Sequence, residues 1–297
     1  RLERLKELMF SQELDGMLLF RQESMFYLTG YDTFGYVFFQ CLYLGIDGRL
    51  ILLTRSPDLR QALQTSIVKD IRIWVDGDSV NPAMEMKNIL HESGLEGKKI
   101  GVEYNSYGLT AKNGKLLDSA LDGFCHLTDA SDLVNRLRVV KSQQELFYVR
   151  KAAELADDAL DEAHSLVKVG CDEGELLAAM QGAVFRGGGD YPGNEFVIGS
   201  GENALLCRYY SGRRKLSPED QITLEWAGAY RHYHAAMMRT IPIGKVTEQH
   251  QRMFDVCLES MEACQKVLRP GNSIGEVFDA YASTCDSSGM RDHRLNA

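Results

Sequence analysis

The residues best suited to chemistry lie in one short stretch, LEWAGAYRHYHAAMMRT, at positions 224–240. Its outgoing half carries Glu225, and its returning half carries His232 and His234. A glutamate with two histidines can hold zinc or iron. The stretch is therefore a metal site, the remnant of a metal site, or a core hairpin that carries a few polar residues.

The outgoing half has the polarity pattern of a strand with two different faces. In QITLEWAG (221–228) every second residue is apolar. Because successive side chains of a strand point to opposite faces, we expect Glu225 on the face opposite Leu224 and Trp226. Without a partner across the sheet, Glu225 would be an ordinary solvated carboxylate.

The returning half carries the two histidines at alternate positions, so we expect His232 and His234 to share one strand face. If the hairpin folds back on itself, that face lies beside Glu225. The pattern H-x-H is also common by chance, and both rings can instead cap an aromatic edge formed by Tyr230 and Tyr233.

A basic cluster, CRYYSGRRK at 207–215, precedes the hairpin. It is either a solvated loop at a dimer surface or a clamp for an anionic group, because the guanidinium fork of arginine matches a carboxylate bidentately. Concentrated positive charge in an acidic chain favours the clamp. The candidate substrate-binding residues are therefore Arg208, Arg213, Arg214 and Tyr209.

Composition excludes several classes of function. The 297 residues include 42 acidic and 33 basic side chains, giving a net charge of −9, which argues against nucleic-acid binding. No apolar run approaches the ~20 residues of a membrane span, and no signal peptide is recognisable at the start. Seven scattered cysteines without a C-x-x-C pair suit reduced thiols, so we expect a cytoplasmic protein.

Other motifs fail the tests for common catalytic sites. GGGDYPG (187–193) precedes a predicted strand and lacks the spacing of a dinucleotide or phosphate loop, so we interpret it as a flexible connection. Ser200 lies in GSGEN, which differs from the G-x-S-x-G turn of a serine nucleophile.

Helix and strand patterns divide the chain near residue 138. Before it, strands are predicted at 15–20, 36–44 and 49–54 among helices, with a tight Asp-Gly turn at 47–48 and only a turn around 27–31. After it, Ser142 and Glu145 form a capping box that starts a long amphipathic helix.

Four segments, in order along nearly the whole chain, resemble the creatinase/aminopeptidase P superfamily, which is peptidase family M24 with the "pita-bread" fold. They are YLTGY (27–31), LRVVKSQQELFYVRKAAELAD (137–157), FVIGSGENA (196–204) and RPGNSIGEV (269–277). The resemblance implies an α/β (α+β) protein with a creatinase-like N-terminal α/β domain over 1–138 and a pita-bread catalytic domain over 139–297. We interpret the second domain as truncated, because the family's later catalytic residues would lie beyond Ala297.

Metallopeptidases of this superfamily carry two metal-bridging aspartates on the hairpin, in a pattern like D-x-G…D-x-T-R-T. In this chain Glu225 stands at the position of the first aspartate and Ala236 at the position of the second. Arg239 and Thr240 match the Arg-Thr that ends the motif. The family's active-site histidine falls at Arg208. Since alanine offers no ligand atom, the resemblance implies a hairpin that has lost its metal, and we expect no metal and no other cofactor.

The same resemblance implies a reaction. Creatinase also has alanine at the position of Ala236 and hydrolyses a C–N bond of a guanidinium compound, and residues 224–240 more closely resemble ectoine hydrolases, which open a cyclic amidine. A small cationic or zwitterionic amidine is the implied substrate, most simply ectoine or hydroxyectoine. Glu225 would pair with it and act as nucleophile or base, while His232 or His234 would move protons. A homodimer is implied.

Two other functions remain open from the sequence. One is a metal-dependent Xaa-Pro aminopeptidase or dipeptidase with altered ligands, which would require bound manganese, zinc or iron. The other is a non-catalytic module that keeps the fold and binds a small ligand without turnover.

Overall fold

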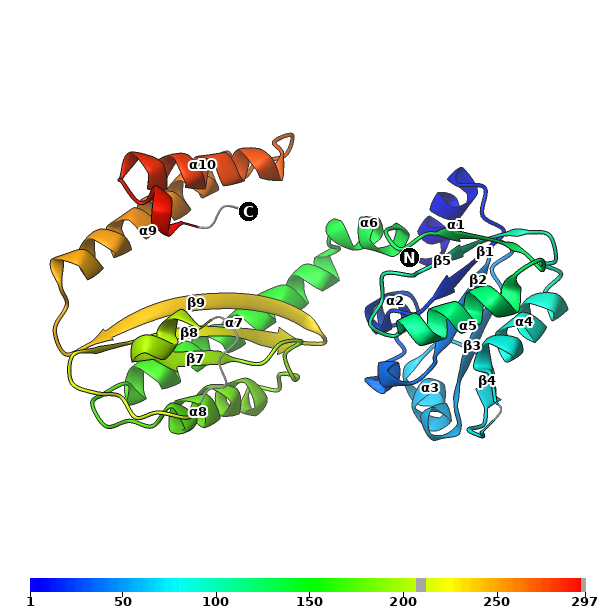
Figure 1. Ribbon diagram of the computed structural model, residues 1–297, viewed down its shortest axis with the longest axis horizontal. Coiled ribbons are helices and arrows are strands. Elements are labelled where there is room, and N and C mark those ends of the chain that lie inside the picture. The colour runs from blue at the N-terminus through cyan, green and yellow to red at the C-terminus, as the bar shows by residue number, and fades with distance from the viewer. Residues whose placement is uncertain (79, 207–211, 295–297) are drawn as a thin grey trace. The chain divides into compact units, whose positions relative to one another are not determined.

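The computed structural model describes residues 1–78, 80–206 and 212–294 (Figure 1). The chain forms two compact units, Arg1–Lys141 and Ser142–Ala297, each with its own hydrophobic core. Among the helices described, none is long and apolar enough to cross a membrane.

The first unit is built around a six-stranded mixed sheet in the order β4-β3-β2-β1-β5-β6. Its elements are α1 (Leu2–Ser11), β1 (Gly16–Leu19), α2 (Gln22–Thr29), η1 (Gly35–Val37), β2 (Cys41–Gly45), β3 (Leu50–Arg55), η2 (Ser56–Asp58), α3 (Leu59–Thr65), β4 (Asp70–Trp74), α4 (Pro82–Glu92), β5 (Lys99–Val102), α5 (Ala111–Leu121), β6 (His126–Asp129) and α6 (Leu133–Val139).

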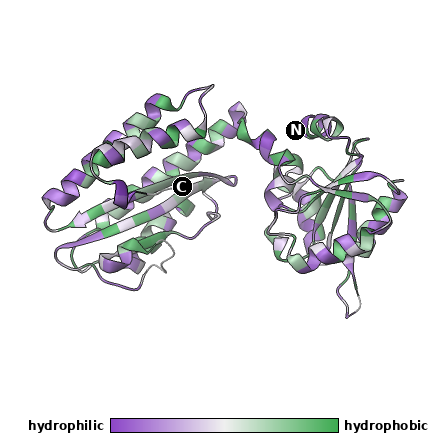
Figure 2. Ribbon diagram, turned by 45° about the horizontal axis from the view of Figure 1, so that its top comes forward, coloured by the Kyte–Doolittle hydropathy of each residue, from purple (hydrophilic) through white to green (hydrophobic). Residues whose placement is uncertain are grey.

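Apolar side chains cover both faces of this sheet, as expected for strands between two layers of helices. Leu18 faces a core that includes Met86 of α4 and Leu117 of α5. Its neighbours Met17 and Leu19 face a second core, which α1, α2, α3 and α6 complete. Figure 2 shows the hydrophobic residues gathered on the central strands, between amphipathic helices.

Helix α2 was missed by the sequence reading, which predicted only a turn around 27–31. The backbone N–H groups of Phe20 and Arg21 donate to Oε2 of Glu103 at 3.0 and 2.7 Å, and the Ser24 hydroxyl donates to Oε1 at 2.5 Å. Glu103 is fully buried, and this burial raises the pKa of its carboxyl despite the three donors. The helix ends at Gly30, which adopts a positive φ of 81°.

The strand predicted over 36–44 is wrong in its first half. Residues 35–37 form η1, the side chains of Val37 and Phe38 are exposed, and β2 begins only at Cys41. The guanidinium of Arg55 stacks on the Phe38 ring at 3.9 Å, and the buried Trp74 indole donates to the carbonyl of Phe39 at 2.9 Å. Side-chain contacts therefore hold this segment outside the sheet.

The hairpin predicted at the Asp-Gly pair exists, with a longer loop than expected. Gly45 N–H donates to the Arg49 carbonyl at 2.8 Å, so three residues form the loop between them. Only Gly48 in this loop has a positive φ, of 90°. This matches a three-residue hairpin loop with glycine in its left-handed position, in place of the two-residue turn expected.

The second unit combines a three-stranded antiparallel sheet, in the order β7-β8-β9, with four α-helices in its described residues. Its elements are α7 (Gln143–Leu166), α8 (Glu173–Arg186), β7 (Val197–Ser200), η3 (Gly201–Leu205), β8 (Asp220–Tyr230), β9 (Tyr233–Ile243), α9 (Glu248–Val267), α10 (Ile274–Ser287) and η4 (Arg291–His293).

Helices α7 and α8 lie on one face of this sheet (Figure 1). The predicted capping box is confirmed: Ser142 and Glu145 each bind the other's backbone N–H at the start of α7. Helices α9 and α10 pack mainly against each other, with Ser260 and Cys285 in contact at 3.5 Å.

Candidate functional site

The candidate site lies on the hairpin formed by β8 and β9. Tyr230 and Tyr233 are the last paired residues, so the turn consists of Arg231 and His232 alone. Both have positive φ, 50° and 64°. A two-residue turn with this backbone matches the right-handed twist of the strands it joins, although neither residue is a glycine.

The inner face of the hairpin belongs to the core. Leu224 and Trp226 are buried against α7 and α8, and the Trp226 indole donates to the Ala156 carbonyl at 3.0 Å. Gly228 lies so close to α7 that a Cβ there would come within 1.9 Å of the Ala152 carbonyl oxygen. Exposure alternates along β8, so the predicted position of Glu225 on the opposite face is confirmed.

The outer face carries one carboxylate among uncharged neighbours. Glu225 is half-buried and pairs directly with Met238 of β9 on one side and with Val197 of β7 on the other. Ala236 pairs with Ala227, one same-face step away along the strands. Directly paired residues of antiparallel strands project their side chains on the same face, so the Glu225 carboxylate is bordered by a thioether and small apolar groups.

His232 does not share a strand face with His234, and this part of the sequence interpretation is wrong. His232 is a turn residue, and β9 begins after it, at Tyr233. Its backbone N–H donates to Oδ2 of Asp190 at 2.9 Å.

His234 uses both ring nitrogens on backbone groups. The N–H of Gly193 donates to Nε2 at 2.8 Å, so Nε2 is unprotonated, and Nδ1 lies 3.0 Å from the His232 carbonyl, where it donates a proton. His234 pairs with Ala229, four residues along β8 from Glu225, which corresponds to roughly 13 Å. The two histidines therefore fasten the loop at 187–193 to the hairpin tip and do not lie beside Glu225.

Across the described residues, no group of three or more histidine, cysteine or carboxylate side chains is arranged to hold a metal ion. Glu225 with His232 and His234, the set that sequence reasoning considered for zinc or iron, does not form one. Among the described strand residues of the outer face, Glu225 is the one carboxylate, and Ala236 offers no ligand atom.

The candidate substrate-binding residues of the basic cluster have different surroundings in the structure. Arg208 and Tyr209 lie outside the described residues. Arg213 is exposed, and its backbone N–H donates to Glu173 at 3.2 Å. The guanidinium of Arg214 is held in an ion pair with Asp220 at 2.5 Å and so supports the start of β8.

Burial alone would raise the pKa of Asp220, but hydrogen bonds from the backbone N–H groups of Ser217 and Gln221 and from Arg214 hold it below its ordinary value. The Arg214 guanidinium also donates to Ser200 Oγ at 2.7 Å. Sequence reasoning missed this network, because Ser200 and Asp220 have no spacing in the chain that indicates contact.

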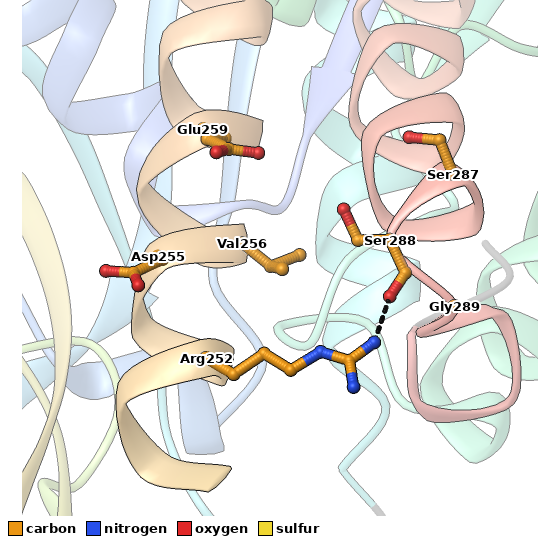
Figure 3. A pocket seen from close by; sticks show the side chains of 7 residues that line it. All are labelled: Arg252, Asp255, Val256, Glu259, Ser287, Ser288 and Gly289. Carbon is orange, nitrogen blue, oxygen red and sulfur yellow. Dashed lines mark hydrogen bonds between the residues drawn. The ribbon is translucent and has the colours of Figure 1, made fainter. Parts of the chain in front are cut away.

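Two open surface hollows in the described residues contain no candidate site residue. One, of about 540 Å³, lies between α9 and α10, and there Arg252 donates to the Ser288 carbonyl at 2.8 Å, which caps the end of α10 (Figure 3). The other, also about 540 Å³, lies between α7 and α8, where Arg186 pairs with Glu162 at 2.7 Å. We assign structural roles to both arginines.

Comparison with known families gives two matches that together span almost the whole chain. Residues 148–296 match metallopeptidase family M24, and residues 1–140 match the creatinase/prolidase N-terminal domain.

The individual relatives include both an ectoine hydrolase and Xaa-Pro dipeptidases. An ectoine hydrolase of Halomonas elongata is 27% identical over 98% of this chain and 76% of its own length. A Xaa-Pro dipeptidase of Pyrococcus horikoshii is 21% identical over 93% of this chain and 74% of its own length. Among solved structures, a dipeptidase from the same organism has a TM-score of 0.85, at 23% identity, over 99% of this chain and 80% of that one. The fold is therefore a creatinase-like N-terminal domain followed by an M24 pita-bread domain.

Proposed function

Since this chain belongs to metallopeptidase family M24, we propose that it is a hydrolase that cleaves a C–N bond of a small cationic amidine, with ectoine or hydroxyectoine as substrate. The observation that carries this proposal is the outer face of the hairpin, where Glu225 stands as a single carboxylate opposite Met238 and next to Ala236.

One carboxylate suits a monovalent, delocalised cation. Metallopeptidases use several carboxylates to hold ions that polarise a neutral amide. An amidinium already carries positive charge on the carbon that water attacks, and its two N–H groups can donate to both oxygens of one carboxylate. The substrate would thus supply the charge that a bound ion supplies elsewhere.

The reaction assigns Glu225 a defined step. Water adds to the amidine carbon while the Glu225 carboxylate accepts a proton from it, and the ring C–N bond then breaks with the proton passing to the leaving nitrogen. The product from ectoine is an N-acetylated diaminobutyrate. We assign no proton transfer to His234, because both of its ring nitrogens are engaged with backbone groups.

The substrate's own carboxylate needs a cation. Arg213, with Arg208 and Tyr209, remains our proposed clamp, whereas Arg214 is omitted because it is paired with Asp220. The similarity to an ectoine hydrolase supports the choice of amidine, and the similarity to Xaa-Pro dipeptidases supports the metal-dependent alternative.

The test is to incubate the purified full-length protein with ectoine and to follow product formation by NMR, with and without a chelator. We expect turnover that persists in chelator and falls by about 10²–10⁴-fold in Glu225→Gln. Glu262→Gln, an exposed position on α9, is the matched control.

Three outcomes would contradict the proposal. Turnover of Xaa-Pro peptides that requires manganese, zinc or iron would identify a metallopeptidase. Ectoine binding without any product would identify a binding module. Unchanged turnover in Glu225→Gln would remove this residue from the reaction.

A further inference from the structure

The outer face of the hairpin is apolar on one side of Glu225 and polar on the other. Towards the hairpin tip, the next pair on this face is Ala227 with Ala236. Away from the tip, the next pair is Thr223 with Thr240. Successive residues on one strand face are ~6.5–7 Å apart, so both pairs lie within reach of a small molecule held at Glu225. The face therefore offers methyl groups at one end and hydroxyl groups at the other.

The two threonine hydroxyls lie beside each other across the strands. Thr223 Oγ1 is 3.3 Å from Thr240 Oγ1, and either oxygen can be the donor. This separation exceeds the usual O–H···O distance of about 2.7–2.8 Å, so the mutual bond is weak. Each hydroxyl has one proton and two lone pairs, so one mutual bond leaves a proton and several lone pairs unused. The threonine pair can therefore donate a hydrogen bond to a ligand and accept one from it.

The threonine pair is covered on one side and open on the other. Gly199 of β7 pairs with Thr223, and a Cβ at Gly199 would lie 2.5 Å from the Asn203 carbonyl oxygen. The backbone of η3 therefore covers the outer face next to Thr223, which is half-buried, whereas Thr240 is exposed. A ligand can reach the two hydroxyls from the side of β9.

We propose that Thr223 and Thr240 form a subsite for the ring hydroxyl of a hydroxylated amidine, so that the enzyme prefers hydroxyectoine to ectoine. This inference rests on the proposed function. In both compounds a methyl group is attached to the amidine carbon, and the hydroxyl of hydroxyectoine is on the ring carbon opposite. With the amidinium at Glu225, the methyl group lies towards Ala227 and Ala236 and the hydroxyl lies towards the threonine pair.

The subsite predicts a moderate preference between the two substrates. The ring hydroxyl donates to one threonine oxygen and accepts the unused proton of the pair. Because these groups are neutral and partly in contact with water, we expect kcat/KM of the wild type to be about three- to tenfold higher for hydroxyectoine than for ectoine.

Substitutions at Thr223 separate its hydroxyl from its shape. Thr223→Val keeps the shape and removes the hydroxyl, so the ratio of kcat/KM for hydroxyectoine to kcat/KM for ectoine should fall to near one, with the value for ectoine little changed. Thr223→Ser keeps the hydroxyl and is the matched control, which should preserve the wild-type ratio. Thr240→Val should lower the ratio in the same way, from an exposed position where the substitution disturbs the fold least.

Three results would overturn the subsite. They are a wild type without preference for hydroxyectoine, a ratio unchanged in both valine variants, and an equal loss on both substrates. The last result would mean that the threonine pair acts only on the structure of the sheet, where such cross-strand pairs also contribute stability.

Equilibrium binding separates this inference from the proposed function, because it needs no turnover. Isothermal titration calorimetry of the wild type and Thr223→Val with each compound should give affinity ratios that follow the same pattern. Preferential binding of hydroxyectoine that depends on Thr223, without any product, would support the subsite and refute the proposed hydrolysis. Turnover of both compounds without dependence on either threonine would refute the subsite and leave the proposed hydrolysis standing. Binding of neither compound would overturn both.

Discussion

Glu225 and Met238 occupy directly opposed positions on β8 and β9, with their side chains on the same outer face of the hairpin. Met238 is 56% exposed, so this apolar partner is not part of the core and lies beside the carboxylate on the neighbouring strand. A thioether is a poor ligand for a hard divalent ion and a good neighbour for an apolar substituent. This pairing supports the proposed amidine substrate, which has one delocalised charge and attached hydrocarbon.

Restoring a second carboxylate should shift the site towards metal binding. Ala236 is the diagonal neighbour of Glu225 on the outer face. We expect Ala236→Asp to raise the affinity for Mn²⁺ at least about tenfold, measured by isothermal titration calorimetry, because two carboxylates then converge on one cation. Hydrolysis of ectoine should fall in parallel.

The control for this experiment is Gln265→Glu, which adds one negative charge at an exposed position of α9. It should bind Mn²⁺ as the wild type does. Equal Mn²⁺ affinity in the two variants would show that Ala236 does not point into the site.

His234 should matter for stability more than for turnover. His234→Phe keeps a ring but removes the acceptor for Gly193 N–H and the donor to the His232 carbonyl. We expect the free energy of unfolding in urea to fall by about 1–3 kcal/mol, since two hydrogen bonds are lost. Turnover should stay near wild type.

His164→Phe, at an exposed position near the end of α7, is the control and should change neither quantity. If turnover of His234→Phe instead falls by about 10²–10⁴-fold, the ring transfers protons and our structural assignment is incorrect.

Substitution by alanine should change the free energy of unfolding in opposite directions at Gly228 and at Gly275. A Cβ at Gly228 would meet the Ala152 carbonyl oxygen at 1.9 Å and the Ala156 nitrogen at 2.7 Å. Gly228→Ala should therefore lower the free energy of unfolding by about 3 kcal/mol or more. At Gly275, in the first turn of α10, the nearest atom would be 3.6 Å away. Gly275→Ala should raise the free energy of unfolding by about 0.5–1 kcal/mol, because alanine loses less conformational entropy than glycine when the helix folds. Urea denaturation checks both values.

The buried Asp220 predicts a pH-dependent contribution to stability. Its folded pKa is held below the ordinary value, so below about pH 4 the unfolded state binds more protons and stability falls. Asp220→Asn should have a lower free energy of unfolding than the wild type at pH 6. The difference in free energy between the two proteins should shrink as the pH falls below about 4. Denaturation curves at several pH values measure it.

Ser217→Ala gives the matched control, because it removes a neutral partner of Arg214, bonded at 3.1 Å. The difference in free energy of unfolding between Ser217→Ala and the wild type should not depend on pH between about 3 and 6. A constant difference for Asp220→Asn would show that this carboxylate does not titrate with folding.

Short-range patterns in the sequence correctly predicted helix starts and strand faces that are determined by residues close together in the chain. The capping box of Ser142 and Glu145 and the alternation that places Glu225 opposite Trp226 both formed as expected. Helix α2 was missed because the acceptor at its start comes from Glu103, about 80 residues away in the chain. Such a long-range cap leaves no pattern near the helix.

The candidate site was predicted less completely, for two physical reasons. A two-residue turn normally needs glycine or asparagine, so Arg231 and His232 gave no turn signal and the strand was extended through His232. Glu173 was overlooked because a glutamate at a helix start usually faces solvent, whereas here the fold surrounds it with donors.

The chain contains two tryptophans, Trp74 in one unit and Trp226 in the other, and each indole N–H is bonded to a backbone carbonyl inside a core. An indole that exchanges such surroundings for water changes its fluorescence. With Trp74 replaced by phenylalanine, the remaining tryptophan emission comes from Trp226 alone, on the inner face of the strand that carries Glu225. The molecule thus carries its own optical reporter for opening of the hairpin, independent of events in the N-terminal unit.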